Sequence, residues 1–126
     1  MKNHFDPKVL ALLAKANTVR IETRRGPRAP VHQTPIWVVV DGEDVYVRSF
    51  TGRTGRWYRE IRANPQGVLL KAGERIPFRA VQVRAPAAIA RASKGYRTKY
   101  AKSPYAKAMV RREILSTTLR LEAVHR

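Results

Sequence analysis

The sequence predicts one α+β domain over residues 1–126, in which six antiparallel strands close into a small barrel flanked by helices. The expected order of elements is helix, three strands, helix, two strands, one or two helices and a final strand. Strands that follow one another through short turns favour antiparallel pairing. Six strongly twisted strands tend to close into a barrel, because closure removes exposed edges.

In the first half of the chain, helix-start signals and strand patterns are clear. Asp6-Pro7 predicts a helix start, because an oxygen acceptor at the N-cap and proline at the first helical position both suit a helix N-terminus. Residues 18–24 alternate between apolar and polar, which is typical of a half-buried strand. The apolar run 35–40 predicts a strand covered on both faces, and Asp41-Gly42 turns it into a return strand over 45–50.

The second half holds a helix end, a hairpin, two helical segments and a last strand. The helix that follows residue 55 is expected to stop at Asn64-Pro65, because a residue before proline disfavours the α conformation. The remaining expected elements are a hairpin over 68–71 and 75–84, a helix from Pro86, a helical segment from Ser103-Pro104 to about Glu113, and a strand over 119–123.

The net charge of the chain indicates an anionic ligand or partner. Twenty-six Lys and Arg stand against nine Asp and Glu, which gives a net charge of +17, and no acidic residue lies between Arg75 and Arg112. A positive field of this size attracts anions, so nucleic acid, anionic lipid and a phosphorylated cofactor are all candidates. Charge alone does not choose among them.

Several classes of site are not expected. The chain has no cysteine, which excludes disulfides, thiolate metal sites and a cysteine nucleophile. The three histidines, His4, His32 and His125, show no ligand spacing, so we expect no metal site. No apolar run approaches the roughly 18 residues of a membrane span. The first residues lack the apolar core of a signal peptide, so we expect a cytoplasmic protein.

The stretch from Val45 to Tyr58 carries the clearest chemical signal. It reads as a strand, a loop rich in glycine, threonine and arginine, and the first turn of a helix. A helix N-terminus carries unpaired N–H groups and about half a positive charge, so such a place suits a phosphate. On this chemistry the candidate side chains are Arg48, Thr51 and Arg56. The loop matches neither the Walker nor the Rossmann pattern and does not name the ligand.

Three segments resemble a known family. They are Gln33 to Val40 (a small polar residue, proline and an apolar strand), Val45 to Tyr58, and Ile61 to Val68 with its Asn-Pro after a helix. Together with Ile76 to Val83 they cover about half of the chain. On these segments the chain resembles the flavin-binding split β-barrel class, which holds pyridoxamine phosphate oxidases and deazaflavin-dependent nitroreductases, and within it an uncharacterised subfamily.

The resemblance implies a six-stranded split barrel and a homodimer that holds FMN, or alternatively a deazaflavin coenzyme, near the subunit interface. It implies a low-specificity oxidoreductase similar to nitroreductases, in which the cofactor carries the hydride chemistry. By position, Ser49 and Arg53 match the phosphate-binding residues, and Thr54 stands where the oxidases have a basic residue. Residues Gln33, Thr34 and Trp37 match the strand that lines the ring.

A second hypothesis rests on the basic segment from Arg91 to Arg112. Tyr96, Tyr100 and Tyr105 are interleaved with its cations, a composition typical of single-stranded nucleic-acid binding. The same tyrosines also fit the apolar stripe of an amphipathic helix. The alternative function is therefore a non-enzymatic protein whose basic surface binds nucleic acid or another polyanion on a barrel without a cofactor.

Overall fold

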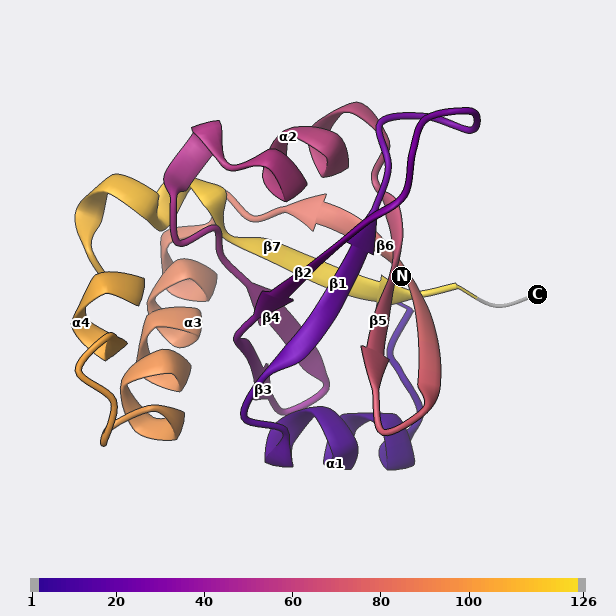
Figure 1. Cartoon of the computed structure of the whole chain (residues 1–126). Coiled ribbons are helices and arrows are strands. Elements are labelled where there is room, and N and C mark those ends of the chain that lie inside the picture. The colour runs from indigo at the N-terminus through magenta and orange to yellow at the C-terminus, as the bar shows by residue number, and fades with distance from the viewer. Residues whose placement is uncertain (1–2, 125–126) are drawn as a thin grey trace.

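The computed structural model describes residues 3–124, which form a curled sheet with a helix at each end and two helices along one side (Figure 1). In chain order the elements are α1 (Pro7–Lys15), β1 (Val19–Thr23), β2 (His32–Ile36), β3 (Val38–Asp41), β4 (Asp44–Val47), the 3₁₀ turn η1 (Gly52–Thr54), α2 (Arg56–Ala63), β5 (Gln66–Lys71), β6 (Glu74–Gln82), α3 (Pro86–Lys99), α4 (Ala106–Met109), the 3₁₀ segment η2 (Arg112–Thr117) and β7 (Leu119–Ala123).

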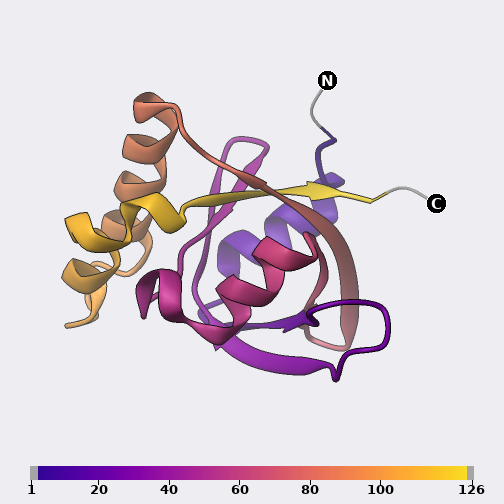
Figure 2. The same ribbon diagram turned by 90° about the horizontal axis from the view of Figure 1, so that it is seen from above.

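Seven strands of the described chain form one sheet, in the order β2-β1-β5-β6-β7-β4-β3. Every neighbouring pair in this order is antiparallel. The strands at the two ends of the order, β2 and β3, are consecutive in the chain, and seen from above the sheet curls round an enclosed space (Figure 2). The predicted α+β class with an antiparallel, curled sheet is therefore confirmed.

The number of strands differs from the prediction, because the run 35–40, expected as one strand, is interrupted at Trp37. Its first half belongs to β2, where Ile36 lies opposite Val19 of β1. Its second half is β3, where Val38 lies opposite Val47 of β4. One bent segment thus pairs with two different strands. The apolar pattern that predicts the strand contains no signal for this change of partner.

Local signals place most helix ends correctly. The Asp6 carboxylate accepts hydrogen bonds from the backbone N–H groups of Lys8 (3.0 Å) and Val9 (3.1 Å), which caps α1 as predicted. Helix α2 ends at Ala63, directly before Asn64-Pro65. The segment expected to be helical over 103–113 is instead the short helix α4 followed by η2. The hydroxyls of Thr117 and Thr118 bond to backbone carbonyls three residues earlier, an alternative to α-helical bonding.

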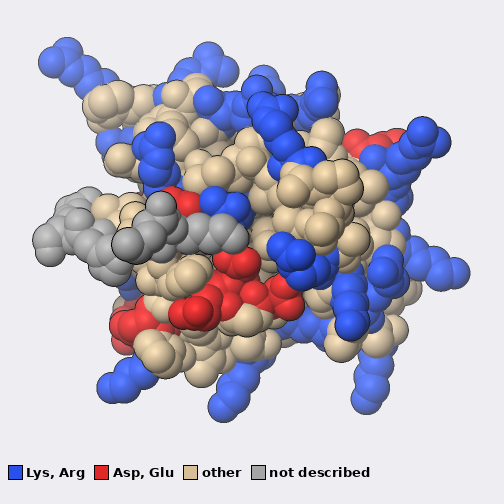
Figure 3. All heavy atoms as spheres, turned by 180° about the vertical axis from the view of Figure 1, so that it is seen from behind, with Lys and Arg blue, Asp and Glu red and all other residues tan. Residues whose placement is uncertain are grey.

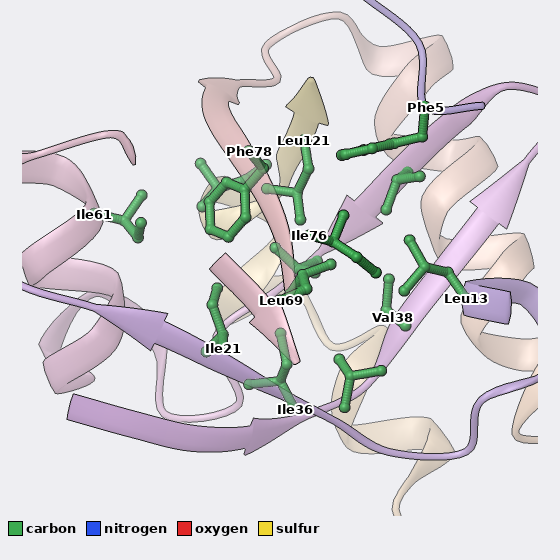
Figure 4. Close-up of a cluster of buried hydrophobic side chains, with 14 of the residues drawn as sticks. Phe5, Leu13, Ile21, Ile36, Val38, Ile61, Leu69, Ile76, Phe78 and Leu121 are labelled. Carbon is green, nitrogen blue, oxygen red and sulfur yellow. The ribbon is translucent and has the colours of Figure 1, made fainter. Parts of the chain in front are cut away.

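The main core fills the space inside the curled sheet, between α1 and α2 (Figure 4). Leu13 of α1 and Ile61 of α2 point into it from opposite ends, and Leu69 and Phe78 from the sheet are fully buried. Burial of a side chain of this kind contributes roughly 1.5–3 kcal/mol. This packing holds the N-terminus of α2 in a fixed position relative to the sheet.

A second cluster lies outside the barrel, where α3 packs on β3 and β4. Ala92 and Tyr96 of α3 are fully buried against Val39 and Tyr46. Gly95 brings the helix close to the sheet, since a Cβ at this position would lie 3.1 Å from the Cβ of Val39. Helix α3 therefore forms a firm wall beside the bend at Trp37.

The surface is dominated by cations. Seen from behind, Lys and Arg project around the outline of the molecule, while most of the visible Asp and Glu lie near the centre and a smaller acidic patch lies at the upper right (Figure 3). None of the helices in residues 3–124 has the length and apolar character that crossing a membrane requires.

Candidate functional site

A cavity of about 420 Å³ opens where the bend between β2 and β3 faces the loop after β4. This volume lies within the roughly 300–1,000 Å³ of small-molecule sites. Three separate parts of the sequence supply its walls. The lining residues are Thr34, Pro35, Ile36 and Trp37 at the bend, Arg48, Phe50 and Thr51 in the loop, Arg56 and Trp57 at the start of α2, and Tyr105 and Met109 at α4.

Five of the nine residues predicted for the site line this cavity: Thr34, Trp37, Arg48, Thr51 and Arg56. The other four lie close by but make different contacts, and their role in ligand binding stays a prediction. Gln33 is exposed and donates to the Glu22 carboxylate at 3.1 Å. Ser49 is fully buried. Arg53 donates to the Ser116 hydroxyl at 3.2 Å, and Thr54 donates to the carbonyl of Thr51 at 3.2 Å.

The loop between β4 and α2 is shaped by two glycines. Gly52 has a φ of +75°, a conformation that side chains other than glycine rarely adopt. Gly55 has an ordinary backbone, but a Cβ there would lie 2.5 Å from the Thr51 hydroxyl and 2.7 Å from the Ser49 hydroxyl. The missing Cβ leaves a small polar cradle directly before α2.

Helix α2 begins at this cradle. Its N-cap is Gly55, and no side chain of the described residues caps its first N–H groups. The eight-residue helix therefore has backbone N–H groups without a side-chain cap, and the positive end of its dipole, beside the Thr51 hydroxyl and the Arg56 guanidinium. This arrangement suits an anionic group, as the order of strand, loop and helix predicts.

Arg48 lies at the inner wall and is 1% exposed. Its Nε donates to the Thr118 hydroxyl (2.8 Å), and its two terminal nitrogens donate to the carbonyls of Met109 (3.0 Å) and Ile89 (2.9 Å). The guanidinium carbon also lies 5.5 Å from the centre of the Tyr96 ring. Burial lowers the pKa of Arg48 from its ordinary value. One side chain thus connects the end of β4 with α3, α4 and the start of β7.

Aromatic rings form the remaining walls. Trp37 stacks on Tyr100 with ring centres 3.8 Å apart and planes within 1° of parallel. The Tyr100 hydroxyl donates to the carbonyl of Asn17 at 2.7 Å, and burial raises the pKa of Tyr100 to about 12. At the mouth, Phe50 and Tyr105 meet edge to face at 6.4 Å and are 47% and 61% exposed. The cavity therefore offers flat apolar surfaces with a polar end.

The model of a family described as "uncharacterized protein conserved in bacteria", DUF2255, matches residues 9–121. The chain belongs to the DUF2255 family. No curated protein sequence matches it.

Solved structures similar to this DUF2255 chain share its fold at low sequence identity. The heme storage protein HutZ from Vibrio cholerae has a TM-score of 0.70 and 12% identity, over 98% of this chain and 92% of its own. An F420-H2-dependent reductase has a TM-score of 0.66 and 17% identity, over 84% and 94%. A candidate pyridoxamine 5′-phosphate oxidase from Listeria innocua has a TM-score of 0.60 and 17% identity, over 93% and 90%. At the level of fold, the predicted likeness to the split-barrel class is confirmed.

Sequence reasoning missed several wall residues of the DUF2255 cavity. The sequence assigns Tyr105 either to a nucleic-acid surface or to a helix stripe, and it gives no signal for Met109, which lies more than fifty residues beyond the loop after β4. Trp57 packs in the main core and also lines the cavity. Phe50 ends the predicted strand, but nothing in the pattern shows that its ring is exposed.

His32 and Glu60 make structural contacts away from the cavity. His32 lies 2.8 Å from the Glu60 carboxylate, whose other oxygen accepts from the Thr23 hydroxyl at 2.7 Å. This cluster fastens α2 to β1 and β2. Within residues 3–124 no group of three or more His, Asp or Glu could hold a metal ion. His125 lies outside the described residues.

Proposed function

We propose that the cavity binds a flavin-type cofactor, FMN or a deazaflavin coenzyme, and that the protein is an oxidoreductase of low specificity similar to nitroreductases. The observation that supports this most is the composition of the cavity. Its flat aromatic walls, Trp37 and Trp57, lie in the same space as the hydroxyl, guanidinium and helix N-terminus that suit a phosphate.

The residues present fit such a ligand at both ends. Thr51 and Arg56 would hold the phosphate with the first N–H groups of α2, and Gly55 lets the Thr51 hydroxyl come close to the start of that helix. Thr34 and Trp37 would orient the ring system, with Trp37 fixed from behind by Tyr100. The cofactor, when bound, supplies the hydride transfer. The apolar lining keeps water from the ring, and the protein groups position it.

Similar structures also include a heme storage protein, but the donor set of this cavity fits heme less well. Heme iron is commonly held by a His, Cys, Met or Tyr side chain. The lining residues include no His and no Cys, Met109 is 4% exposed, and Tyr105 lies at the open mouth. The phosphate-binding features favour a phosphorylated flavin-type ligand instead.

Tryptophan fluorescence tests the proposal, because the two tryptophans of the chain both line the cavity. We expect FMN to quench most of the emission at a stoichiometry of one per chain. Riboflavin, which lacks the phosphate, is expected to bind at least about tenfold more weakly, because it loses charge-assisted hydrogen bonds. A deazaflavin titration distinguishes the two cofactor types. Emission that neither cofactor changes would remove the proposal.

Two arginines of the phosphate loop provide a matched comparison. Arg56→Ala is expected to weaken FMN binding by about 1.5–3 kcal/mol, the usual contribution of a hydrogen bond to a charged group. Arg53 points to Ser116 and does not line the cavity, so the resemblance alone places it at the phosphate. A loss of affinity in Arg53→Ala as large as in Arg56→Ala would show that the phosphate extends past η1. Unchanged binding in both variants would show that the loop is not the phosphate site.

A homodimer belongs to the same proposal. Phe50 and Tyr105 are two large apolar side chains left exposed, and both lie at the mouth of the cavity. Exposed aromatic groups of this kind commonly mark an interface. A second copy of the chain would cover them and enclose the ring.

The alternative function, a basic surface for nucleic acid or another polyanion, is favoured by α3 and α4. Lys94, Arg97, Lys102 and Lys107 are exposed, and none has an ion-pair partner in the described part of the chain. Tyr96 and Tyr100 are buried, so stacking of bases on these two rings is not available. Contacts with the phosphate backbone of a nucleic acid would remain. The affinity for a duplex oligonucleotide should then fall by about 10³-fold or more between 50 and 200 mM salt. Absence of binding at low salt would remove the alternative.

A further inference from the structure

Arg48 is a buried cation without a carboxylate. Seven of the nine acidic side chains form ion pairs elsewhere in residues 3–124, and none of these pairs includes Arg48. Its three hydrogen bonds go to two backbone carbonyls and one hydroxyl, all of which are neutral. Buried charges are normally paired, because removal from water is costly. The positive charge at the inner wall is therefore uncompensated in the protein itself.

The Arg48 guanidinium also has N–H groups that make no hydrogen bond to the described residues. It carries five N–H groups, and three of them have acceptors, which leaves two without an acceptor in the described residues. Arg48 lines the cavity together with Trp37 and Met109. A ligand that enters between these walls lies against a flat aromatic surface and beside this buried cation.

This inner cation is separate from the phosphate cradle. Arg48 follows β4 and is fixed from behind by α3, α4 and Thr118, whereas the cradle is built from Thr51, Gly55 and the first turn of α2. A single phosphate in the cradle would leave the inner charge unpaired. The cavity thus has two positive places, at Arg48 and at the first turn of α2.

We infer that Arg48 forms a second anion subsite, which takes the acidic group of a planar aromatic acid, and that such an acid is the class of substrate for this cavity. The inference rests on the proposed function only in taking this cavity as the ligand site. The bidentate fork of a guanidinium matches the two oxygens of a carboxylate, and the ring of the acid would lie against Trp37.

Benzoate and benzamide test the inference on the unaltered protein, since they share a shape and differ in charge. We expect benzoate to quench tryptophan emission with an affinity at least about tenfold higher than benzamide. The titrations are made in about 0.5 M NaCl, where exposed charges are screened within a few ångströms and a buried one is not. Equal affinities for the two compounds would overturn the inference.

Two variants locate the charge that produces the preference. In Arg48→Gln we expect the ratio of the two affinities to fall to near one, and in Lys94→Met, which removes an exposed cation of α3, we expect it to stay unchanged. If the ratio of the benzoate and benzamide affinities in Arg48→Gln equals the wild-type ratio, the inference is contradicted. If Arg48→Gln does not fold, the ratios measured for the wild-type protein and for Lys94→Met decide whether the inference holds. FMN binding without a preference for benzoate would overturn this inference alone. A preference for benzoate without FMN binding would overturn the cofactor proposal alone.

Discussion

Replacing Arg48 with methionine is expected to lower the free energy of unfolding by about 3 kcal/mol. The change removes one donor from the acceptors at Met109 and Thr118, which are buried, and at Ile89, which is partly buried. Loss of a partner by a buried acceptor costs roughly 1–3 kcal/mol. Removal of an unpaired buried charge offsets part of this cost. Chemical denaturation followed by circular dichroism measures the difference, provided that the denaturant dependence is unchanged.

Arg91→Met is the matched control for this prediction. Arg91 lies on the outer side of α3, and its Nε is 3.2 Å from the Asp41 carboxylate in an exposed ion pair. Loss of such a pair costs no more than about 1 kcal/mol. If Arg48→Met were as stable as Arg91→Met, the three hydrogen bonds of Arg48 would not contribute to the connection of β4 with α3 and α4.

Gly55→Ala is expected to weaken FMN binding by about tenfold or more while the protein stays folded. The added Cβ would fill the cradle, because it lies within 2.7 Å of the hydroxyls of Thr51 and Ser49 and must displace them. The backbone at Gly55 has φ −59° and ψ 137°, which alanine adopts without strain, so the effect falls on the cradle. Displacing hydrogen-bond donors from a charged group costs about 1.5–3 kcal/mol. The dissociation constant measures it directly.

Gly26→Ala provides the comparison. A Cβ at Gly26 has no atom within 4 Å, and the residue lies in the loop between β1 and β2. We expect its affinity for FMN to equal that of the unaltered chain. Equal affinities in Gly55→Ala and Gly26→Ala would show that the ligand phosphate does not occupy the cradle.

The parts of the fold that local signals determine could be predicted from the sequence. The cap at Asp6, the helix end before Asn64-Pro65 and the turn at Asp41-Gly42 depend on residues that are neighbours in the chain. The division of one predicted strand at Trp37 could not be predicted, because both halves have the same apolar pattern. Which strand each half pairs with is decided by the closure of the whole sheet.

In the candidate site, too, local signals could be predicted from the sequence and long-range packing could not. The order of strand, loop and helix predicted the uncapped helix N-terminus and brought Thr51 and Arg56 to the cavity. The burial of Arg48 could not be predicted, since arginine is among the residues that are rarely buried. Its acceptors come from residues 41 to 70 positions further along the chain. The contribution of Met109 depends on the same long-range packing.

A crystal structure of the protein with FMN would show whether the cavity is the cofactor site. We expect planar tricyclic density in the cavity, with the ring against Trp37 and Trp57 and the phosphate beside Thr51, Arg56 and the first turn of α2. Density for FMN elsewhere on the surface, with these side chains in contact only with one another and with solvent, would contradict this expectation.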